Sequence, residues 1–266
     1  MRVLTIDLED WFQVYNFNKI IKFKDWDNHK VRAVNKTKRL LKILNEHNTK
    51  ATFFVLGWIA DKHPELIKDI HDGGHEIACH GYCHKPIFLM SKKEFAKDID
   101  KAKKAIKKSC GVNPVGYRAP SFSIVKNTLW ALDTLKKKGF KYDSSMVPGN
   151  NHPDYGIKNI PKRPFKIKDI LEIPMTTFFG FPLGGGYFRL YPYCLTKFLL
   201  KKRKNAIFYV HPWEFDPKMP RYKLPLIKKF RHYVGLNSTE KKFKKLLKDF
   251  RFSRIEDVYK RKKIKK

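Results

Sequence analysis

The feature that most limits the fold is an alternation of short apolar segments with longer segments of helical spacing. About seven apolar segments have the length and composition of buried strands, at residues 2–6, 50–57, 76–79, 115–117, 140–142, 170–177 and 206–210. Alternating strands and helices indicate βα units around a parallel sheet. The chain of 266 residues is long enough for one α/β barrel or for two small domains, and its length alone does not decide between them.

The segments between the strands carry ordinary helix signals. Residues 34–47 place leucines on one face. Ser91 and Glu94 form a capping box ahead of a helix with a stripe of Phe95, Ile99, Ala102 and Ile106. Pro64 predicts the first turn of a short helix at 65–71, and a final helix is expected from Ser238.

Polar residues follow five of the predicted strands, at the point where each strand ends. They are Asp7 with Glu9 and Asp10, then His80 with His84, Arg118, Asp143 and His211. In α/β barrels the carboxyl ends of the strands form the active-site face. The pattern therefore predicts an enzyme with these residues at one site.

His80 and His84 are spaced i, i+4, which on one helical turn would direct both imidazoles to the same metal ion. The alternative is a pair of half-buried histidines in a connecting loop. Cys79 and Cys83 flank the pair and could be taken for further ligands. Thiolates would favour a closed structural zinc site, which conflicts with an open catalytic one. We therefore interpret both cysteines as packing residues.

The three carboxylates that follow the first strand, Asp7, Glu9 and Asp10, are costly to crowd together unless they share a cation. The alternative is a polar turn whose acids cap the next helix. Two histidines and one carboxylate leave a position for water, as in catalytic metal sites. A second carboxylate as base and a histidine as acid would complete the hydrolysis of an amide or ester. Arg118 would keep an aspartate ionised, and Asp143 would orient His211.

These motifs resemble the polysaccharide deacetylases of the NodB-homology class, carbohydrate esterase family 4, over residues 1–214. His80 and His84 stand in the family's metal-binding HxxxH motif, Arg118 in its RxP motif, and His211 in the late motif of the general acid. The resemblance implies a distorted seven-stranded (β/α) barrel. It also implies removal of N-acetyl groups from a polysaccharide or a lipid-linked sugar by metal-bound water. The ion would be divalent, zinc first, with cobalt, nickel or manganese as alternatives.

The sequence departs from the family in its first motif, where Leu8 replaces the usual aspartate ligand. Strand alternation directs Asp7 and Glu9 to one side, so we favour Asp7 as base and Glu9 as ligand. Asp10 could replace Glu9 if the chain turns after Leu8. The resemblance extends to a subgroup that has a C-terminal extension and is associated with exopolysaccharide assembly. We therefore predict a barrel at 1–216 and a basic helical extension at 217–266 packed on it.

The formal net charge of +33 favours an anionic partner, against the alternative of a solvated lysine surface. A nucleic-acid-binding protein is a rival interpretation, but the basic residues are spread along the chain and no recognition motif is present. We expect no specific nucleic acid and a peripheral contact with anionic membrane. Residues 1–10 contain no signal-peptide pattern, and no run of about 18 apolar residues occurs, which predicts a cytoplasmic location.

Two other functions fit the same residues. One is a hydrolase of a small cyclic amide or ureide on the same fold. The other is a barrel that binds polysaccharide without catalysis, which the histidine pair and Asp7 argue against. The sequence does not determine the sugar, the metal or the oligomeric state.

Overall fold

The computed structural model describes residues 2–149, 152, 155–203 and 205–257. The chain forms two compact units. Unit 1 comprises Met1–Ala51 and Leu183–Lys266, and unit 2 comprises Thr52–Pro182. Of the predicted basic extension at 217–266, residues 258–266 lie outside the described residues. The predicted boundary between 216 and 217 coincides with neither unit border and stays a prediction.

Two parallel strands form the centre of unit 1. Strand β1 (Arg2–Leu8) pairs with β10 (Ala206–Val210), from Arg2 opposite Ala206 to Ile6 opposite Val210. All of β10 and nearly all of β1 are buried, as expected for strands covered on both faces. The parallel register brings the carboxyl ends of the two strands, just before His211 and at Asp7, to the same edge.

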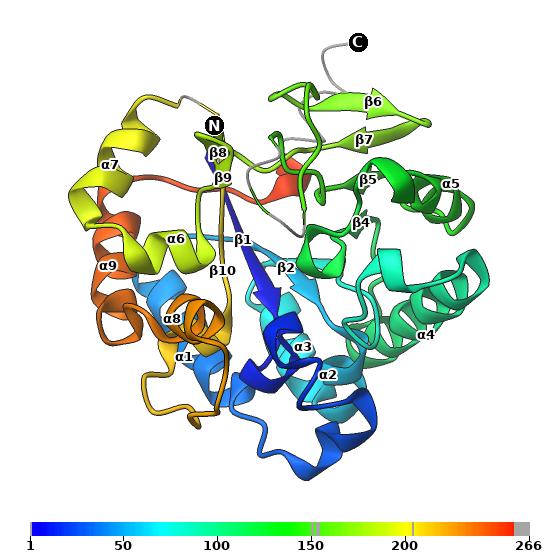
Figure 1. Cartoon of the computed structure of the whole chain (residues 1–266), viewed down its shortest axis with the longest axis horizontal. Helices are drawn as coiled ribbons and strands as arrows, with labels where there is room; N and C mark the ends of the chain where they lie inside the picture. Colours follow the sequence, from blue (N-terminus) through cyan, green and yellow to red (C-terminus); the bar gives the residue numbers. More distant parts are fainter. Residues whose placement is uncertain (1, 150–151, 153–154, 204, 258–266) are drawn as a thin grey trace. The chain divides into compact units, whose positions relative to one another are not determined.

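The α-helices of unit 1 lie to one side of β1 and β10 (Figure 1). They are α1 (Ala33–Glu46), α6 (Gly185–Leu190), α7 (Tyr193–Lys201), α8 (Leu226–Tyr233) and α9 (Leu236–Asp249). The final helix, α9, buries Phe243, Leu246 and Leu247. It begins two residues earlier than Ser238, after Gly235 in a left-handed conformation. A Cβ on Gly235 would lie 2.3 Å from the carbonyl oxygen of Arg189, so only glycine fits there.

Five parallel strands form the sheet of unit 2. Their order is β2 (Thr52–Val55), β3 (Glu76–Cys79), β4 (Gly116–Tyr117), β5 (Tyr142–Asp143) and β7 (Ile170–Glu172). Strand β6 (Phe165–Ile167) pairs antiparallel with β7, and β8 (Thr177–Phe178) pairs antiparallel with β9 (Phe181–Pro182). Within the described residues, the parallel strands of the two units confirm the predicted βα alternation.

Four α-helices accompany the strands within the described part of unit 2 (Figure 1): α2 (Gly57–Lys62), α3 (Pro64–Asp72), α4 (Lys92–Cys110) and α5 (Trp130–Lys137). The Ser91–Glu94 capping box is confirmed, since Ser91 Oγ accepts the Glu94 N–H and Glu94 Oε2 accepts the Ser91 N–H. Helix α2 was not predicted, because Gly57 was expected to end a strand. A Cβ on Gly57 would lie 2.7 Å from the Cα atom of Ala102, so glycine permits the close packing of α2 on α4.

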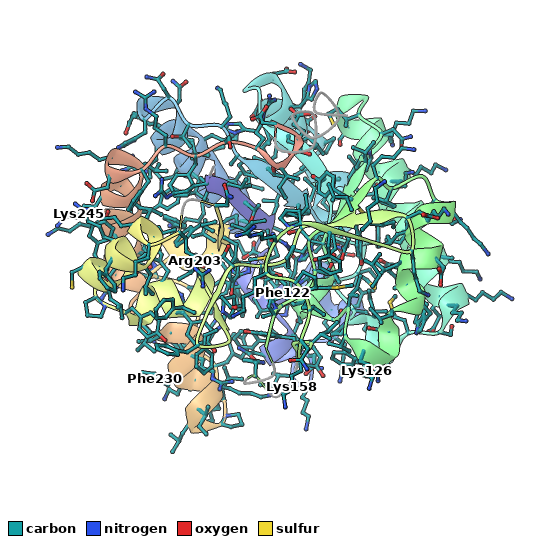
Figure 2. All side chains as sticks on the ribbon, turned by 90° about the horizontal axis from the view of Figure 1, so that it is seen from above. Phe122, Lys126, Lys158, Arg203, Phe230 and Lys245 are labelled. Carbon is teal, nitrogen blue, oxygen red and sulfur yellow. The ribbon has the colours of Figure 1, made fainter. Side chains whose placement is uncertain are left out.

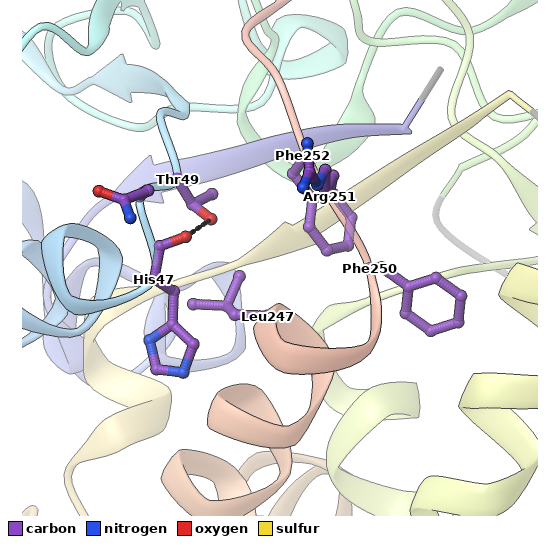
Figure 3. A pocket seen from close by; sticks show the side chains of 7 residues that line it. His47, Thr49, Leu247, Phe250, Arg251 and Phe252 are labelled. Carbon is purple, nitrogen blue, oxygen red and sulfur yellow. Dashed lines mark hydrogen bonds between the residues drawn. The ribbon is translucent and has the colours of Figure 1, made fainter.

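A hollow of about 340 Å³ opens in unit 1 near the amino end of β1. Figure 3 shows Arg251 and the side chains of Phe250 and Phe252 around it, with Thr49 donating a hydrogen bond to the His47 carbonyl. The nearby Ser253 pairs with the start of β1, at Val3. None of the seven lining residues is a carboxylate, and the hollow is therefore distinct from the acidic cluster at the carboxyl end of β1.

Candidate active site

Asp7, Glu9 and His211 come together in unit 1 where β1 and β10 end. The His211 Nε2 atom lies 3.4 Å from Glu9 Oε1 and 3.8 Å from Asp7 Oδ2. Asp7 and Glu9 thus face the same side, as strand alternation predicted. Trp213 Nε1 donates a hydrogen bond of 3.1 Å to Glu9 Oε1 and fixes that carboxylate. Both carboxylates are buried.

The other ring nitrogen of His211 faces Glu214, a residue that is not among the site residues predicted from the sequence. His211 Nδ1 lies 3.1 Å from Glu214 Oε2, and the same oxygen accepts the His211 backbone N–H. Arg189 Nε donates a hydrogen bond of 2.6 Å to Glu214 Oε1. Asp143 was expected to orient His211. At Nδ1 this prediction is corrected, because Glu214 is the partner of that nitrogen. The signal that could have found Glu214 is its i+3 spacing from His211 on the turn at Pro212–Phe215.

Neighbouring charges together outweigh burial in setting the protonation of His211 and Glu214. Burial lowers the pKa of His211, but the carboxylates of Glu9, Glu214 and Asp7 raise it to about 9. Burial would raise the pKa of Glu214, but Arg189 and His211 lower it below its ordinary value. His211 is therefore an imidazolium at neutral pH, held between carboxylates on both ring nitrogens.

Asp10 has a different role from its neighbours Asp7 and Glu9. Its Oδ2 atom accepts the backbone N–H groups of Arg32 and Ala33, at the start of α1, and its Oδ1 atom accepts the N–H of Trp11. Burial outweighs these hydrogen bonds and raises the pKa of Asp10 to about 6. For Asp10, the alternative that these acids cap the next helix is correct, and both oxygens are already engaged.

A stack of three rings supports the cluster. His211 stacks on Trp213 with ring centroids 5.4 Å apart, and Trp213 stacks on His232 at 4.5 Å. His232 is 1% exposed, and neither of its ring nitrogens has a hydrogen-bond partner among the described residues. Burial, together with the nearby Arg189 charge, lowers the pKa of His232 to about 3.

The neutral state of buried His232 predicts acid-sensitive stability. Because its folded pKa lies below the ordinary value of 6.5, its neutral form stabilises the fold above pH 6.5, and this contribution is lost as the pH falls towards 3. From pH 7 to pH 5, the unfolding free energy should therefore fall in both the wild type and His232→Phe. The fall should be larger in the wild type by about 2 kcal/mol. Urea unfolding at both pH values measures this. Exposed His71→Gln should behave as the wild type, and equal losses in wild type and His232→Phe would contradict the assignment.

His80 and His84 lie in unit 2 on the loop that follows β3. The structure corrects the prediction of a helical turn, because Gly81 has φ 74° and His84 has φ 51°, and residues 80–84 contain no helix. Asp98 of α4 holds the loop by accepting the backbone N–H groups of Tyr82 and Cys83. The two imidazole rings are nevertheless close, with centroids 5.2 Å apart, and both residues are buried.

The backbone around this loop fixes the tautomer of His80. His80 Nδ1 lies 2.8 Å from the carbonyl oxygen of Arg118, so Nδ1 carries the proton and the Nε2 lone pair is the one suited to a metal. Burial raises the pKa of both Cys79 and Cys83 to about 12. Both therefore stay thiols, in agreement with their interpretation as packing residues.

Arg118 and Asp143 lie among buried polar groups of unit 2. Arg118 donates to the carbonyl oxygen and the hydroxyl of Ser144, and its guanidinium stacks 4.1 Å from the centre of the Phe54 ring. Asp143 accepts from the Ser145 hydroxyl and shares a hydrogen bond with Glu172. Burial raises the pKa of both carboxyls, and that of Glu172 more strongly because it also faces the Asp143 charge. The role of Arg118 in keeping the catalytic aspartate ionised stays a prediction.

Comparisons with known families agree with the motifs described above. Residues 22–142 match the family "Polysaccharide deacetylase", and residues 144–260 match a "Domain of unknown function (DUF3473)". Residues 22–142 therefore carry a polysaccharide deacetylase domain. The deacetylase match contains His80, His84 and Arg118, whereas Arg189, His211 and Glu214 lie in the second match.

A peptidoglycan-N-acetylglucosamine deacetylase of Bacillus cereus is 33% identical over 131 residues. That similarity covers 44% of this chain and 48% of the relative, so it spans about half of that protein. Among solved structures, a Mycobacterium smegmatis protein assigned to the polysaccharide deacetylases matches with a TM-score of 0.62 at 19% identity, over 97% of this chain and 89% of its own.

A pseudoenzyme of carbohydrate esterase family 4 from Bacillus anthracis also has this fold, with a TM-score of 0.53 at 16% identity, over 97% of this chain and 64% of its own. These matches confirm the predicted fold, a distorted (β/α) barrel with C-terminal helices. Because a pseudoenzyme shares it, the fold by itself does not establish activity.

Proposed function

We propose that this chain is a metal-dependent hydrolase that removes N-acetyl groups from a polysaccharide or a lipid-linked sugar. The observation that carries the proposal is the convergence of Asp7 and Glu9 on the Nε2 atom of His211, whose Nδ1 atom is held by Glu214. Such a cluster places a carboxylate base and an imidazole acid within reach of one reacting group. The family match supports an N-acetylated sugar as the substrate.

We propose Glu9, His80 and His84 as the residues that hold the metal, a donor set that could bind such an ion. Two imidazoles and one carboxylate suit zinc, and they leave a coordination position for the reactants. Glu9 is preferred over Asp10 because both oxygens of Asp10 accept backbone hydrogen bonds. When bound, a divalent ion would polarise the acetyl carbonyl and acidify water.

The protein side chains would handle the protons. Asp7 takes a proton from the attacking water as the water adds to the acetyl carbon. His211 Nε2 donates a proton to the sugar nitrogen as the bond between carbon and nitrogen breaks, which releases acetate and an amine. Glu214, fixed by Arg189, keeps His211 oriented and stabilises its charged form. Arg118 is proposed to hold Asp7 ionised, and Asp143 to belong to the same polar network.

Acetate release tests this proposal directly. We expect metal-stripped protein to release acetate from chitooligosaccharides or peptidoglycan fragments only after zinc or cobalt is added. A hydantoin in the same panel tests the alternative substrate class. Hydantoin opening without acetate release would favour the cyclic-amide hydrolase. Stoichiometric metal binding with turnover of neither substrate would favour a barrel that only binds polysaccharide.

The predictions of a cytoplasmic location and of no specific nucleic-acid partner have no bearing on this test and stay predictions.

A further inference from the structure

Helix α8 exposes apolar side chains that no other described residue covers. Leu226 is 84% exposed, Ile227 69% and Phe230 56%. Their spacing of i, i+1 and i+4 places them on one face of the helix. Figure 2 shows Phe230 at the outer edge of the view. The C-terminal end of α8 is packed, since His232 and Tyr233, its last two residues, are buried.

Basic residues surround this face. Residues 217–239 contain six lysines and arginines, Lys218, Arg221, Lys223, Lys228, Lys229 and Arg231, and no aspartate or glutamate. Of these, Lys229 and Arg231 belong to α8 and are exposed. A short helix with an exposed apolar face between cations is the pattern of helices that lie in the interface of an anionic bilayer.

We propose that α8 docks this protein on the surface of an anionic lipid bilayer, with Leu226, Ile227 and Phe230 inserted among the acyl chains. A soluble polyanion would pair with the cations but would leave the three apolar side chains in water. A second copy would cover the apolar side chains but would bring two strongly basic faces together. A bilayer with acidic headgroups satisfies both features. None of the described helices has the length and hydropathy of a membrane-spanning segment.

The base of α8 is joined to the candidate active site. Arg189 donates hydrogen bonds to the carbonyl oxygens of Arg231, His232 and Val234, at the C-terminal end of α8. The same guanidinium holds Glu214, the partner of His211. Two side chains, Arg189 and Glu214, therefore connect the C-terminal end of α8 to His211. This suits a substrate presented at a membrane, but the docking proposal does not depend on the catalytic one.

Vesicle sedimentation of the full chain tests the proposal. The vesicles contain one-third phosphatidylglycerol and two-thirds phosphatidylcholine, or phosphatidylcholine alone. We expect the wild type to bind the anionic vesicles, more weakly as salt is added, and to prefer them strongly over the neutral ones. The triple variant Leu226→Ser/Ile227→Ser/Phe230→Ser should bind them about 100-fold more weakly.

The matched control is Leu190→Ser/Leu195→Ser/Phe198→Ser. It also removes three partly exposed apolar side chains from unit 1 and leaves the charge unchanged. It should bind the anionic vesicles as the wild type does, and thermal unfolding should show that both variants are folded. The proposal is overturned if the wild type does not bind, if the α8 variant keeps wild-type affinity, or if the control loses as much as the α8 variant. It is also overturned if the wild type and the control are dimers and the α8 variant is a monomer.

Discussion

His80→Ala should lose both stoichiometric zinc binding and acetate release. The Nδ1 atom of His80 donates to the Arg118 carbonyl oxygen, so its Nε2 atom is already oriented for a metal before one binds. With alanine, the proposed site keeps one imidazole and one carboxylate, too few protein ligands to hold zinc tightly. We expect acetate release to fall at least about 1000-fold, because the metal supplies several kcal/mol of transition-state stabilisation.

Metal content per chain and acetate release are measured on the same preparation of His80→Ala. The control is His71→Ala, a substitution in the same unit at an exposed histidine. It should keep the metal and the activity of the wild type. If His80→Ala is folded and still binds one zinc ion with full activity, the proposed ligand set is wrong. If it keeps the metal but loses activity, His80 acts on the substrate instead of the metal.

Glu214→Gln should lower kcat at least about 100-fold with little change in KM. In Ser-His-Asp hydrolases, a buried carboxylate holds the catalytic imidazole and stabilises its charged form in the transition state. Glu214 contacts His211 Nδ1 at 3.1 Å, and a neutral amide cannot stabilise the imidazolium in the same way. Glu214 is one of the carboxylates that raise the pKa of His211 to about 9, so the alkaline limb of the kcat profile should move to lower pH.

The same substitution should also destabilise the fold, by about 3 kcal/mol, because it leaves the buried Arg189 charge without its anion. Rates are therefore compared at a temperature where the variant is fully folded. Glu240→Gln removes an exposed partner of Arg39 and should change neither kcat nor the pH profile. A purely structural role for Glu214 would lower stability without moving the alkaline limb, and that result would contradict the assignment.

Local patterns in the sequence predicted many of the elements well. Strand β10 has the bounds read from the apolar run at 206–210, and the Ser91 capping box begins α4 as expected. Pro64 occupies the first turn of α3. These features depend on residues within a few positions of each other, and their physical causes are local hydrogen bonds, steric limits and the periodicity of burial.

Tertiary contacts decided the elements that were missed. The loop with His80 and His84 is shaped by Asp98, which follows Cys83 by 15 residues, and by positive φ values at Gly81 and His84. Helix α2 begins at Gly57, where packing against Ala102 of α4 requires the absence of a side chain. A histidine pair at i, i+4 fits both a helix and such a loop, so the spacing alone could not distinguish them.

The sequence by itself determined the fold class and the residue types of the candidate site. Both follow from local features, namely the spacing of apolar residues in the strands and the polar residues that come directly after them. It also placed Asp7 and Glu9 on the same side through simple alternation. Only the tertiary structure decided which carboxylate serves which partner. Asp10 became a helix cap and Glu214 the partner of His211, because Arg189, 25 residues before Glu214, supplies the charge that keeps that buried carboxylate ionised. Ion pairs between distant residues follow from packing, and no local pattern encodes them.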